Sequence, residues 1–131
     1  MKHVLLIEDD PQFVEIYRIK LMKLGCKIYA AKSVVEARKY LRDEMPDIIL
    51  LDIMLSGSEN GFDLLREIKS RLDETHTPVI VLTNLPEDHE KTAKALGAHD
   101  FFIKAQASIE KVMDTITALL KIPCDKPAVT S

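Results

Sequence analysis

The sequence predicts an α/β fold in which a doubly wound, five-stranded parallel sheet carries helices on both faces. Five short apolar runs occur along the 131 residues, each bounded by turn residues, as expected of strands that are buried on both faces. Segments with the apolar period of helices follow each of these runs. Because strand and helix alternate five times, right-handed crossovers are expected to join parallel neighbours.

The composition is that of a soluble globular protein, with 47% hydrophobic and 30% charged residues and a formal net charge of −3. A chain of this length predicts one domain, residues 1–122, followed by a short tail, residues 123–131. Lysine and arginine form no basic stripe, which argues against direct nucleic-acid binding. No apolar run is long enough to cross a membrane. Cys26 and Cys124 lack metal or redox spacing and fit a reducing cytoplasm.

The first half of the chain contains three strands and two helices. The first helix runs from Pro11 to about residue 24, with Asp10 as its N-cap. The second begins at Ser33, whose spacing to Glu36 is that of a capping box, and ends near residue 44. The strands are expected at residues 4–7, 27–31 and 47–51.

The second half contains three helices and two strands. A helix follows the loop at residues 55–60, and a polar loop at residues 73–77 ends it. The next helix begins at Pro86 and ends at Gly97, and the last covers residues 109–121. The strands are expected at residues 78–82 and 101–103.

The carboxyl ends of the strands gather the polar residues, at the edge where open parallel sheets bind ligands. Glu8 and Asp9 follow the first strand, Asp52 the third, Thr83 the fourth and Lys104 the fifth. Carboxylates about 4 Å apart repel by about 4 kcal/mol per pair at an effective dielectric constant near 20. A hard divalent cation relieves this repulsion, and Mg²⁺ prefers carboxylate oxygens. The sequence therefore predicts a magnesium site.

Asp52 is the candidate for covalent chemistry, because a carboxylate held against a cation can attack phosphorus. Phosphoryl transfer needs mainly positioning and charge neutralisation, which Lys104 and the Thr83 hydroxyl are suited to provide. Each of these residues also has a plainer interpretation, as a helix-capping acid, a solvated lysine or a turn residue.

Four stretches resemble the receiver domain of response regulators, the phosphorylated module of two-component signalling. They are VLLIEDDP at residues 4–11, ILLDIML at 49–55, VIVLT at 79–83 and GAHDFFIK at 97–104. The likeness extends over about residues 2–121. It implies a cytoplasmic protein with a flavodoxin-like fold, in which the strand order is 2-1-3-4-5.

The resemblance also implies roles for the residues at the strand ends. Asp52 matches the phospho-acceptor, Asp9 the direct Mg²⁺ ligand, and Glu8 the acid that acts on the metal through water. The backbone carbonyl of Met54 matches the third protein ligand. The phosphate-binding lysine, the switch hydroxyl and the aromatic switch that turns inward on activation match Lys104, Thr83 and Phe101.

The implied phosphoryl donor is a phosphohistidine on a sensor histidine kinase or on a histidine phosphotransfer protein. The face that carries the fourth helix, the fifth strand and the last helix is expected to change and to meet a downstream protein. The domain catalyses only its own phosphorylation and dephosphorylation, so it is not expected to be an enzyme. Homodimerisation on phosphorylation is left open, as is whether residues 123–131 lead to an effector domain.

The sequence departs from the family pattern at four places. Ala105 stands where proline is usual, often with a cis bond, and Asn84 where a small residue is usual. Phe101 replaces the commoner tyrosine, and the loop at residues 55–60 is one residue longer, with Ser56 in place of a common proline. None of these changes removes a reacting group, so they bear on the rate of phosphorylation and on the lifetime of the phosphoryl group.

Two alternative functions stay open at this point. The departures keep alive a degenerate receiver, which would act as a phosphorylation-independent interaction module. A hydrolase that works through an aspartyl-phosphate is the other alternative. Those enzymes usually carry a second acid two residues after the nucleophile, and Met54 at that position argues against turnover of an outside substrate.

Overall fold

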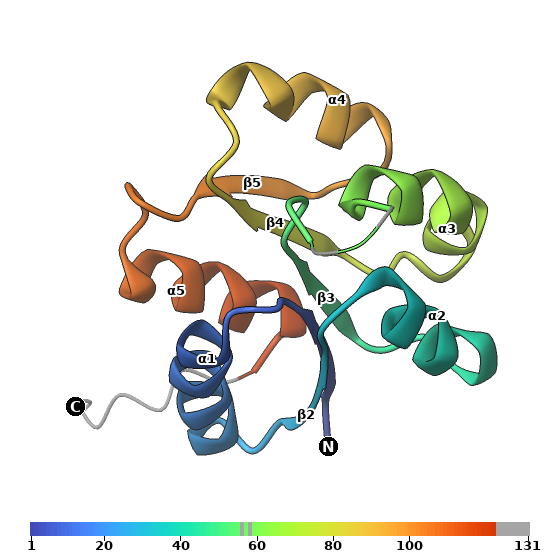
Figure 1. Cartoon of the computed structure of the whole chain (residues 1–131). Helices are drawn as coiled ribbons and strands as arrows, with labels where there is room; N and C mark the ends of the chain where they lie inside the picture. The colour runs from blue at the N-terminus through green and yellow to red at the C-terminus, as the bar shows by residue number, and fades with distance from the viewer. Residues whose placement is uncertain (56, 58, 123–131) are drawn as a thin grey trace.

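A computed structural model describes residues 1–55, 57 and 59–122 of the chain (Figure 1). Within them, five strands form one parallel sheet in the order β2-β1-β3-β4-β5, which confirms the predicted topology. Ser56, Cys124 and the predicted tail at residues 123–131, on which the sequence analysis also made predictions, lie outside the described residues. The strands are β1 (His3–Ile7), β2 (Lys27–Ala31), β3 (Ile48–Leu51), β4 (Val79–Thr83) and β5 (Asp100–Ile103).

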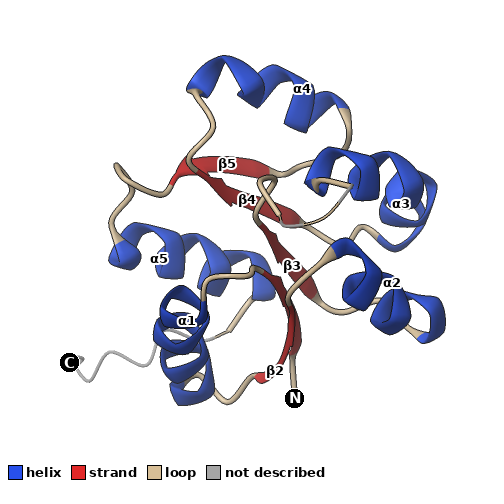
Figure 2. Ribbon diagram, in the orientation of Figure 1, coloured by secondary structure: helices blue, strands red, loops and turns tan. Residues whose placement is uncertain are grey.

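Helices cover both faces of the sheet (Figure 2). One face packs against α1 (Pro11–Lys23) and α5 (Ile109–Leu120). The other packs against α2 (Val34–Asp43), α3 (Gly61–Thr75) and α4 (Glu90–Ala95). None of the helices in the described part of the chain is both long and apolar enough to cross a membrane.

The core lies in two layers, because successive side chains of a strand point to opposite faces of the sheet. Leu5 and Ile49 belong to the layer under α2, α3 and α4, whereas Leu6 and Leu50 belong to the layer under α1 and α5. All four residues of β3 are buried. Each such side chain contributes roughly 1.5–3 kcal/mol of burial free energy, so the central strand is a rigid base for whatever follows it.

The helix starts follow the predicted caps. The Asp10 carboxylate accepts the Gln12 N–H, and the Ser33 hydroxyl accepts the Glu36 N–H. The capping box at Ser33 is incomplete, because the Glu36 carboxylate accepts the N–H of Lys32, one residue before the N-cap. The complete box lies instead at the start of α3, between Asn60 and Asp63.

Two expectations for the second half of the chain were wrong. Residues 73–75 are helical rather than part of a polar loop, because Leu72 extends the buried stripe and Asp73 pairs with Lys69 on the exposed face at 3.2 Å. The α-helix expected from Pro86 begins only at Glu90, after a 3₁₀ turn, η1 (Glu87–His89). Polar residues on a solvent-facing turn carry no apolar period, so the sequence pattern did not separate helix from loop there.

Candidate functional site

The register of the sheet brings the strand ends together. Ile7 of β1 pairs with Leu51 of β3, so the next residues, Glu8 and Asp52, leave the sheet side by side. Carboxylate oxygens of Glu8, Asp9 and Asp52 all lie within 4.8 Å of one another. The three acids that the sequence analysis singled out therefore form one cluster at the carboxyl edge of the sheet.

Glu8 is almost completely buried, with 1% of its surface exposed, and Asp52 is 6% exposed. Burial disfavours a charged carboxylate, and this raises the pKa of Glu8 above its ordinary value. Hydrogen bonds from Lys104 and from the Asp10 N–H, at 3.1 Å, offset part of that rise. A buried acid of this kind needs a cation close by to stay ionised.

Lys104 provides such a cation. Its ammonium nitrogen contacts Glu8 Oε1 and lies 3.0 Å from Asp52 Oδ2. Burial alone would lower the pKa of Lys104, but the hydrogen bonds to the two carboxylates outweigh burial and raise it. The Nζ atom also lies 4.5 Å from the centre of the Phe13 ring, a cation–π contact. The lysine is therefore charged and held in place on three sides.

Phe13 is a contact that the sequence analysis missed, since it appeared there only as an apolar residue of the first helix. A usable signal did exist. Phe13 lies in the first turn of α1, directly after the acids that end β1, and so close to the same edge of the sheet.

Asp52 is oriented by its own backbone and by the start of α3. Its N–H donates to the Ile7 carbonyl at 3.0 Å, and its Oδ1 accepts the Met54 N–H at 3.0 Å. A Cβ atom at Gly61 would lie 2.8 Å from Ile53 Cα and 2.9 Å from the Asp52 carbonyl oxygen. Glycine is therefore required at the first position of α3, which passes directly against the backbone of Asp52. The role of the Met54 carbonyl as a metal ligand stays a prediction.

Thr83 and Phe101 are both inside the molecule. Thr83 is fully buried, and its hydroxyl oxygen accepts the Leu85 N–H at 3.4 Å, which leaves the hydroxyl proton to be donated elsewhere. Phe101 packs in the core layer under α2, α3 and α4. The role of Phe101 as a switch stays a prediction.

Two of the departures from the family pattern meet at one hydrogen bond. The Asn84 side-chain oxygen accepts the Ala105 N–H at 3.2 Å. The peptide bond between Lys104 and Ala105 is trans. Lys104 N–H donates to the Thr83 carbonyl at 2.8 Å, one residue earlier on each segment. Because proline has no N–H, this link needs a residue such as Ala105.

A cavity of about 570 Å³ opens beside the acid cluster. Asp9 lines it together with Met54, Phe62, Leu85 and His89. Most of the other lining residues are apolar, with Asn60 and His89 as the exceptions, so a charged group bound here would take its polar contacts mainly from the acid cluster.

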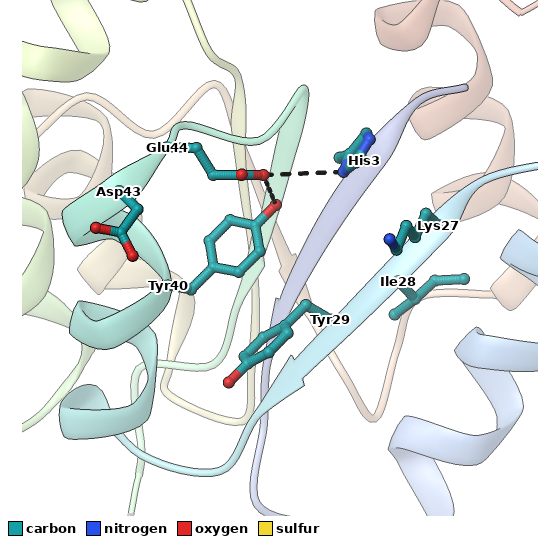
Figure 3. A pocket seen from close by; sticks show the side chains of 7 residues that line it. All are labelled: His3, Lys27, Ile28, Tyr29, Tyr40, Asp43 and Glu44. Carbon is teal, nitrogen blue, oxygen red and sulfur yellow. Dashed lines mark hydrogen bonds and ion pairs between the residues drawn. The ribbon is translucent and has the colours of Figure 1, made fainter.

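A second cavity, of about 330 Å³, lies between edge strand β2 and helix α2 (Figure 3). The rings of Tyr29 and Tyr40 are 4.9 Å apart there, and the Tyr40 hydroxyl donates to Glu44 at 3.1 Å. His3, at the amino end of β1, also lines it. None of the site residues predicted from the sequence lines this cavity, which places it apart from the acid cluster.

Comparisons of the chain with known proteins agree on one family. The family model described as the response regulator receiver domain matches residues 4–117. Protein PilH of Pseudomonas aeruginosa is 30% identical over 123 residues, which cover 92% of this chain and 98% of PilH.

Solved structures agree with that match. A two-component response regulator from Clostridium difficile is 25% identical with a TM-score of 0.81, covering 92% of this chain and 97% of that one. The receiver domain of a sensor histidine kinase from Pseudomonas aeruginosa has a magnesium ion coordinated in its active site cleft. It is 21% identical with a TM-score of 0.77, covering 92% of this chain and 98% of that one. The chain described here therefore belongs to the response regulator receiver domain family.

Proposed function

We propose that this chain is a phospho-accepting receiver of a two-component or phosphorelay pathway. Asp52 takes a phosphoryl group from a phosphohistidine in the presence of Mg²⁺, and the resulting change of conformation controls a partner. One observation carries the proposal: Asp52 directly follows a fully buried strand, and its carboxylate oxygens lie within 4.8 Å of two further carboxylates and 3.0 Å from the Lys104 ammonium. This is the set of groups that phosphoryl transfer to a carboxylate requires.

The donor atoms of the cluster fit Mg²⁺. Glu8, Asp9 and Asp52 offer carboxylate oxygens close together, and no histidine or cysteine belongs to this group. Asp9 and Asp52 would hold the metal directly, Glu8 through water, and Met54 through its carbonyl. A bound Mg²⁺ would neutralise charge as the phosphoryl group approaches the carboxylates.

The residues of the chain perform the transfer as follows. A carboxylate oxygen of Asp52 attacks phosphorus, the bond between phosphorus and the histidine nitrogen breaks, and an aspartyl-phosphate forms. The Lys104 ammonium leaves Asp52 Oδ2, binds a phosphoryl oxygen instead, and neutralises part of the charge of the phosphoryl group. The Thr83 hydroxyl donates its proton to another phosphoryl oxygen. Attack by water on the aspartyl-phosphate later releases phosphate and restores the free carboxylate.

The change at the site reaches the surface through Thr83 and Phe101. Phe101 lines a cavity of about 350 Å³ together with Glu90 of α4 and Lys111 of α5. A shift of the ring would therefore alter the face formed by α4, β5 and α5, where we place the downstream protein partner. Phosphorylation shifts the equilibrium because only the active state gives the phosphoryl group its contacts with Thr83 and Lys104. The cytoplasmic location and the absence of direct nucleic-acid binding remain predictions.

The experiment is intact mass spectrometry after incubation with acetyl phosphate, with and without Mg²⁺, beside Asp52→Asn. We expect the wild type to gain one phosphoryl group, and we expect no gain in the variant or without the metal. An equal gain in the variant would overturn the assignment of Asp52. If the wild type gains nothing from acetyl phosphate or from a phosphorylated phosphotransfer protein, the proposal fails.

A degenerate receiver is the second candidate, and one observation favours it. The Lys104 ammonium already contacts Glu8 and Asp52, so the cluster has an internal cation without Mg²⁺. In that case the chain would act as a phosphorylation-independent interaction module. Absence of Mg²⁺ binding in a folded wild-type protein, measured by titration calorimetry, would favour this second candidate over the first.

A further inference from the structure

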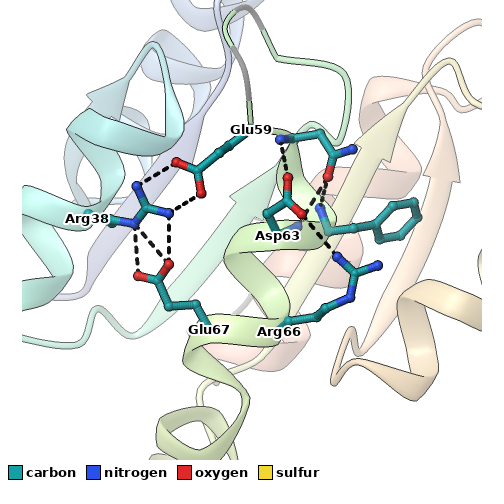
Figure 4. A network of polar contacts seen from close by, with 7 residues as sticks. Arg38, Glu59, Asp63, Arg66 and Glu67 are labelled. Carbon is teal, nitrogen blue, oxygen red and sulfur yellow. Dashed lines mark hydrogen bonds and ion pairs between the residues drawn. The ribbon is translucent and has the colours of Figure 1, made fainter.

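A second group of charges lies at the surface, between α2, α3 and the segment that connects β3 to α3 (Figure 4). Arg38 of α2 is at its centre. Two guanidinium nitrogens of Arg38 donate to the two oxygens of Glu59, at 2.8 and 2.5 Å. The Nε atom lies 2.9 Å from both oxygens of Glu67 on α3. One guanidinium thus binds two carboxylates from different parts of the chain.

The position of Glu59 gives this contact a consequence for the site. Glu59 belongs to the segment that leaves Asp52 and Met54 and returns at the start of α3. Arg38 is half-buried, with 31% of its side chain exposed, and Glu59 is 39% exposed. Paired N–H donors on a carboxylate fix direction as well as distance. The contact therefore fixes Glu59 to α2, an element that supplies none of the three acids of the cluster.

The end of the same segment is held by contacts of its own. The Asn60 side-chain oxygen accepts the N–H groups of Phe62 and Asp63, and Asp63 accepts the Asn60 N–H at 2.8 Å. The Gly61 N–H donates to the Ile53 carbonyl at 2.9 Å. These bonds fix residues 60 and 61 at the start of α3, next to the backbone of Ile53. Within the described residues, Arg38 supplies the contact that joins Glu59 to α2.

We propose that Arg38 is a positioning residue, which clamps Glu59 so that residues 59–61 stay in place against Ile53, next to Asp52, as metal binding and phosphorylation require. The inference rests on the proposed function of Asp52 and Met54. Loss of the clamp loosens residues 59–61 and weakens Mg²⁺ binding, although Arg38 itself touches neither the metal ligands nor the phosphoryl group. Lysine cannot replace it, because a single ammonium lacks the planar fork that binds Glu59 and Glu67 together.

The chain offers a matched control. Glu67 binds the same guanidinium as Glu59 but lies on α3, outside the segment. Glu67→Gln removes a charge pair of comparable exposure and leaves the clamp on Glu59 in place. Arg38→Gln and Glu59→Gln remove the clamp from its two sides. If the clamp is the cause, the double variant Arg38→Gln, Glu59→Gln behaves like either single variant rather than adding their effects.

The experiment measures two properties of the full chain for each variant. Amide hydrogen exchange by NMR, without metal, reports the opening of residues 59–61, and we expect exchange about threefold faster in Arg38→Gln and Glu59→Gln, as befits the loss of a largely exposed ion pair. Mg²⁺ titration reports the metal site, and we expect affinity about threefold lower in the same variants. Glu67→Gln should match the wild type in both measurements.

Three results would overturn the proposal. The first is unchanged exchange and Mg²⁺ affinity in Arg38→Gln and Glu59→Gln while the wild type binds the metal. The second is an equal loss in Glu67→Gln, which would indicate general destabilisation. The third is full additivity in the double variant. Failure of the wild type to bind Mg²⁺ would instead refute the proposed function, and the exchange rates would then decide whether the clamp exists.

Discussion

Two clusters in this molecule each place one cation between two carboxylates, and they differ in burial. Lys104 lies between Glu8 and Asp52 inside the edge of the sheet, with 15% of its side chain exposed. Arg38 lies between Glu59 and Glu67 at the surface, with 31% exposed. The buried cluster has a third carboxylate, Asp9, within reach.

The difference in burial determines which role each cluster is suited for. A buried charge that loses its partner is poorly solvated by the protein around it. The pairing of Lys104 with Glu8 and Asp52 therefore responds strongly when a cation or a phosphoryl group arrives. A surface cluster is surrounded by water and salt, so removing one of its charges lowers the free energy of unfolding only slightly. The buried Lys104 cluster is therefore suited to metal binding and phosphoryl transfer, and the exposed Arg38 cluster to holding Glu59 in place.

The largest expected effect comes from removing the cation of each cluster in turn. Lys104→Met leaves Glu8 and Asp52 unpaired, and we expect a loss of about 3–5 kcal/mol in the free energy of unfolding without metal. Arg38→Gln should cost only about 0–1 kcal/mol. Urea denaturation measures both. Mg²⁺ should restore more stability to Lys104→Met than it adds to the wild type, because the metal then has no ammonium to displace.

Equal losses in these two variants would contradict the comparison. So would a failure of Mg²⁺ to stabilise Lys104→Met more than the wild type. Lys104→Arg is the control that keeps a positive charge at the buried position, and it should lose less stability than Lys104→Met.

The pH dependence of stability should have opposite signs in the two clusters. Burial raises the pKa of Glu8 above its ordinary 4.5, so the unfolded chain loses this proton first and stability falls as pH rises from 4.5. Hydrogen bonds from Arg38 lower the pKa of Glu59 below 4.5, so its contribution is present above 4.5 and is lost as pH falls below it.

Urea denaturation in metal-free buffer, from acidic to neutral pH, tests this pair of signs with two variants. The stability of the wild type relative to Glu8→Gln should decrease as pH rises above 4.5. Its stability relative to Glu59→Gln should decrease as pH falls below 4.5. If both stability differences change with pH in the same direction, the two clusters do not differ in the sign of their pH dependence, and this prediction is wrong.

The smallest expected effect concerns the turn that carries Lys104. Asn84→Ala removes the hydrogen bond to the Ala105 N–H and should cost about 0.5–1.5 kcal/mol. In an Ala105→Pro background the donor is absent, so the same Asn84→Ala change should cost nothing further. Urea denaturation of the four proteins completes the cycle. If Asn84→Ala lowers the free energy of unfolding equally in both backgrounds, the hydrogen bond between Asn84 and Ala105 does not contribute to stability.

The sequence was sufficient for the strands and for the acids that follow them. Apolar runs of fixed length end at Ile7 and Leu51, and parallel register then brings Glu8 next to Asp52 without further information. The pairing of Arg38 with Glu59 is different, because the two residues are 21 positions apart and meet only through the packing of α2 beside α3. No local pattern encodes such a contact.

Two further failures have physical reasons. Residues 73–75 read as a loop because they are polar, yet an exposed helical turn tolerates polar residues and is held by its buried neighbour Leu72. Phe13 read as ordinary core, because an apolar stripe does not tell which of its members will meet a charged group. Its contact with Lys104 forms because the start of α1 lies close to the residue that follows β5, and these two parts of the chain are far apart in sequence.

The most direct test of the central claim is to locate the phosphoryl group. Borohydride reduces an aspartyl-phosphate to homoserine, so protein treated with acetyl phosphate and Mg²⁺ can be reduced, digested and sequenced by tandem mass spectrometry. We expect homoserine at position 52 and unchanged residues at positions 8, 9 and 10. Homoserine at another position, or a phosphoryl group that resists reduction and lies on a hydroxyl, would contradict it.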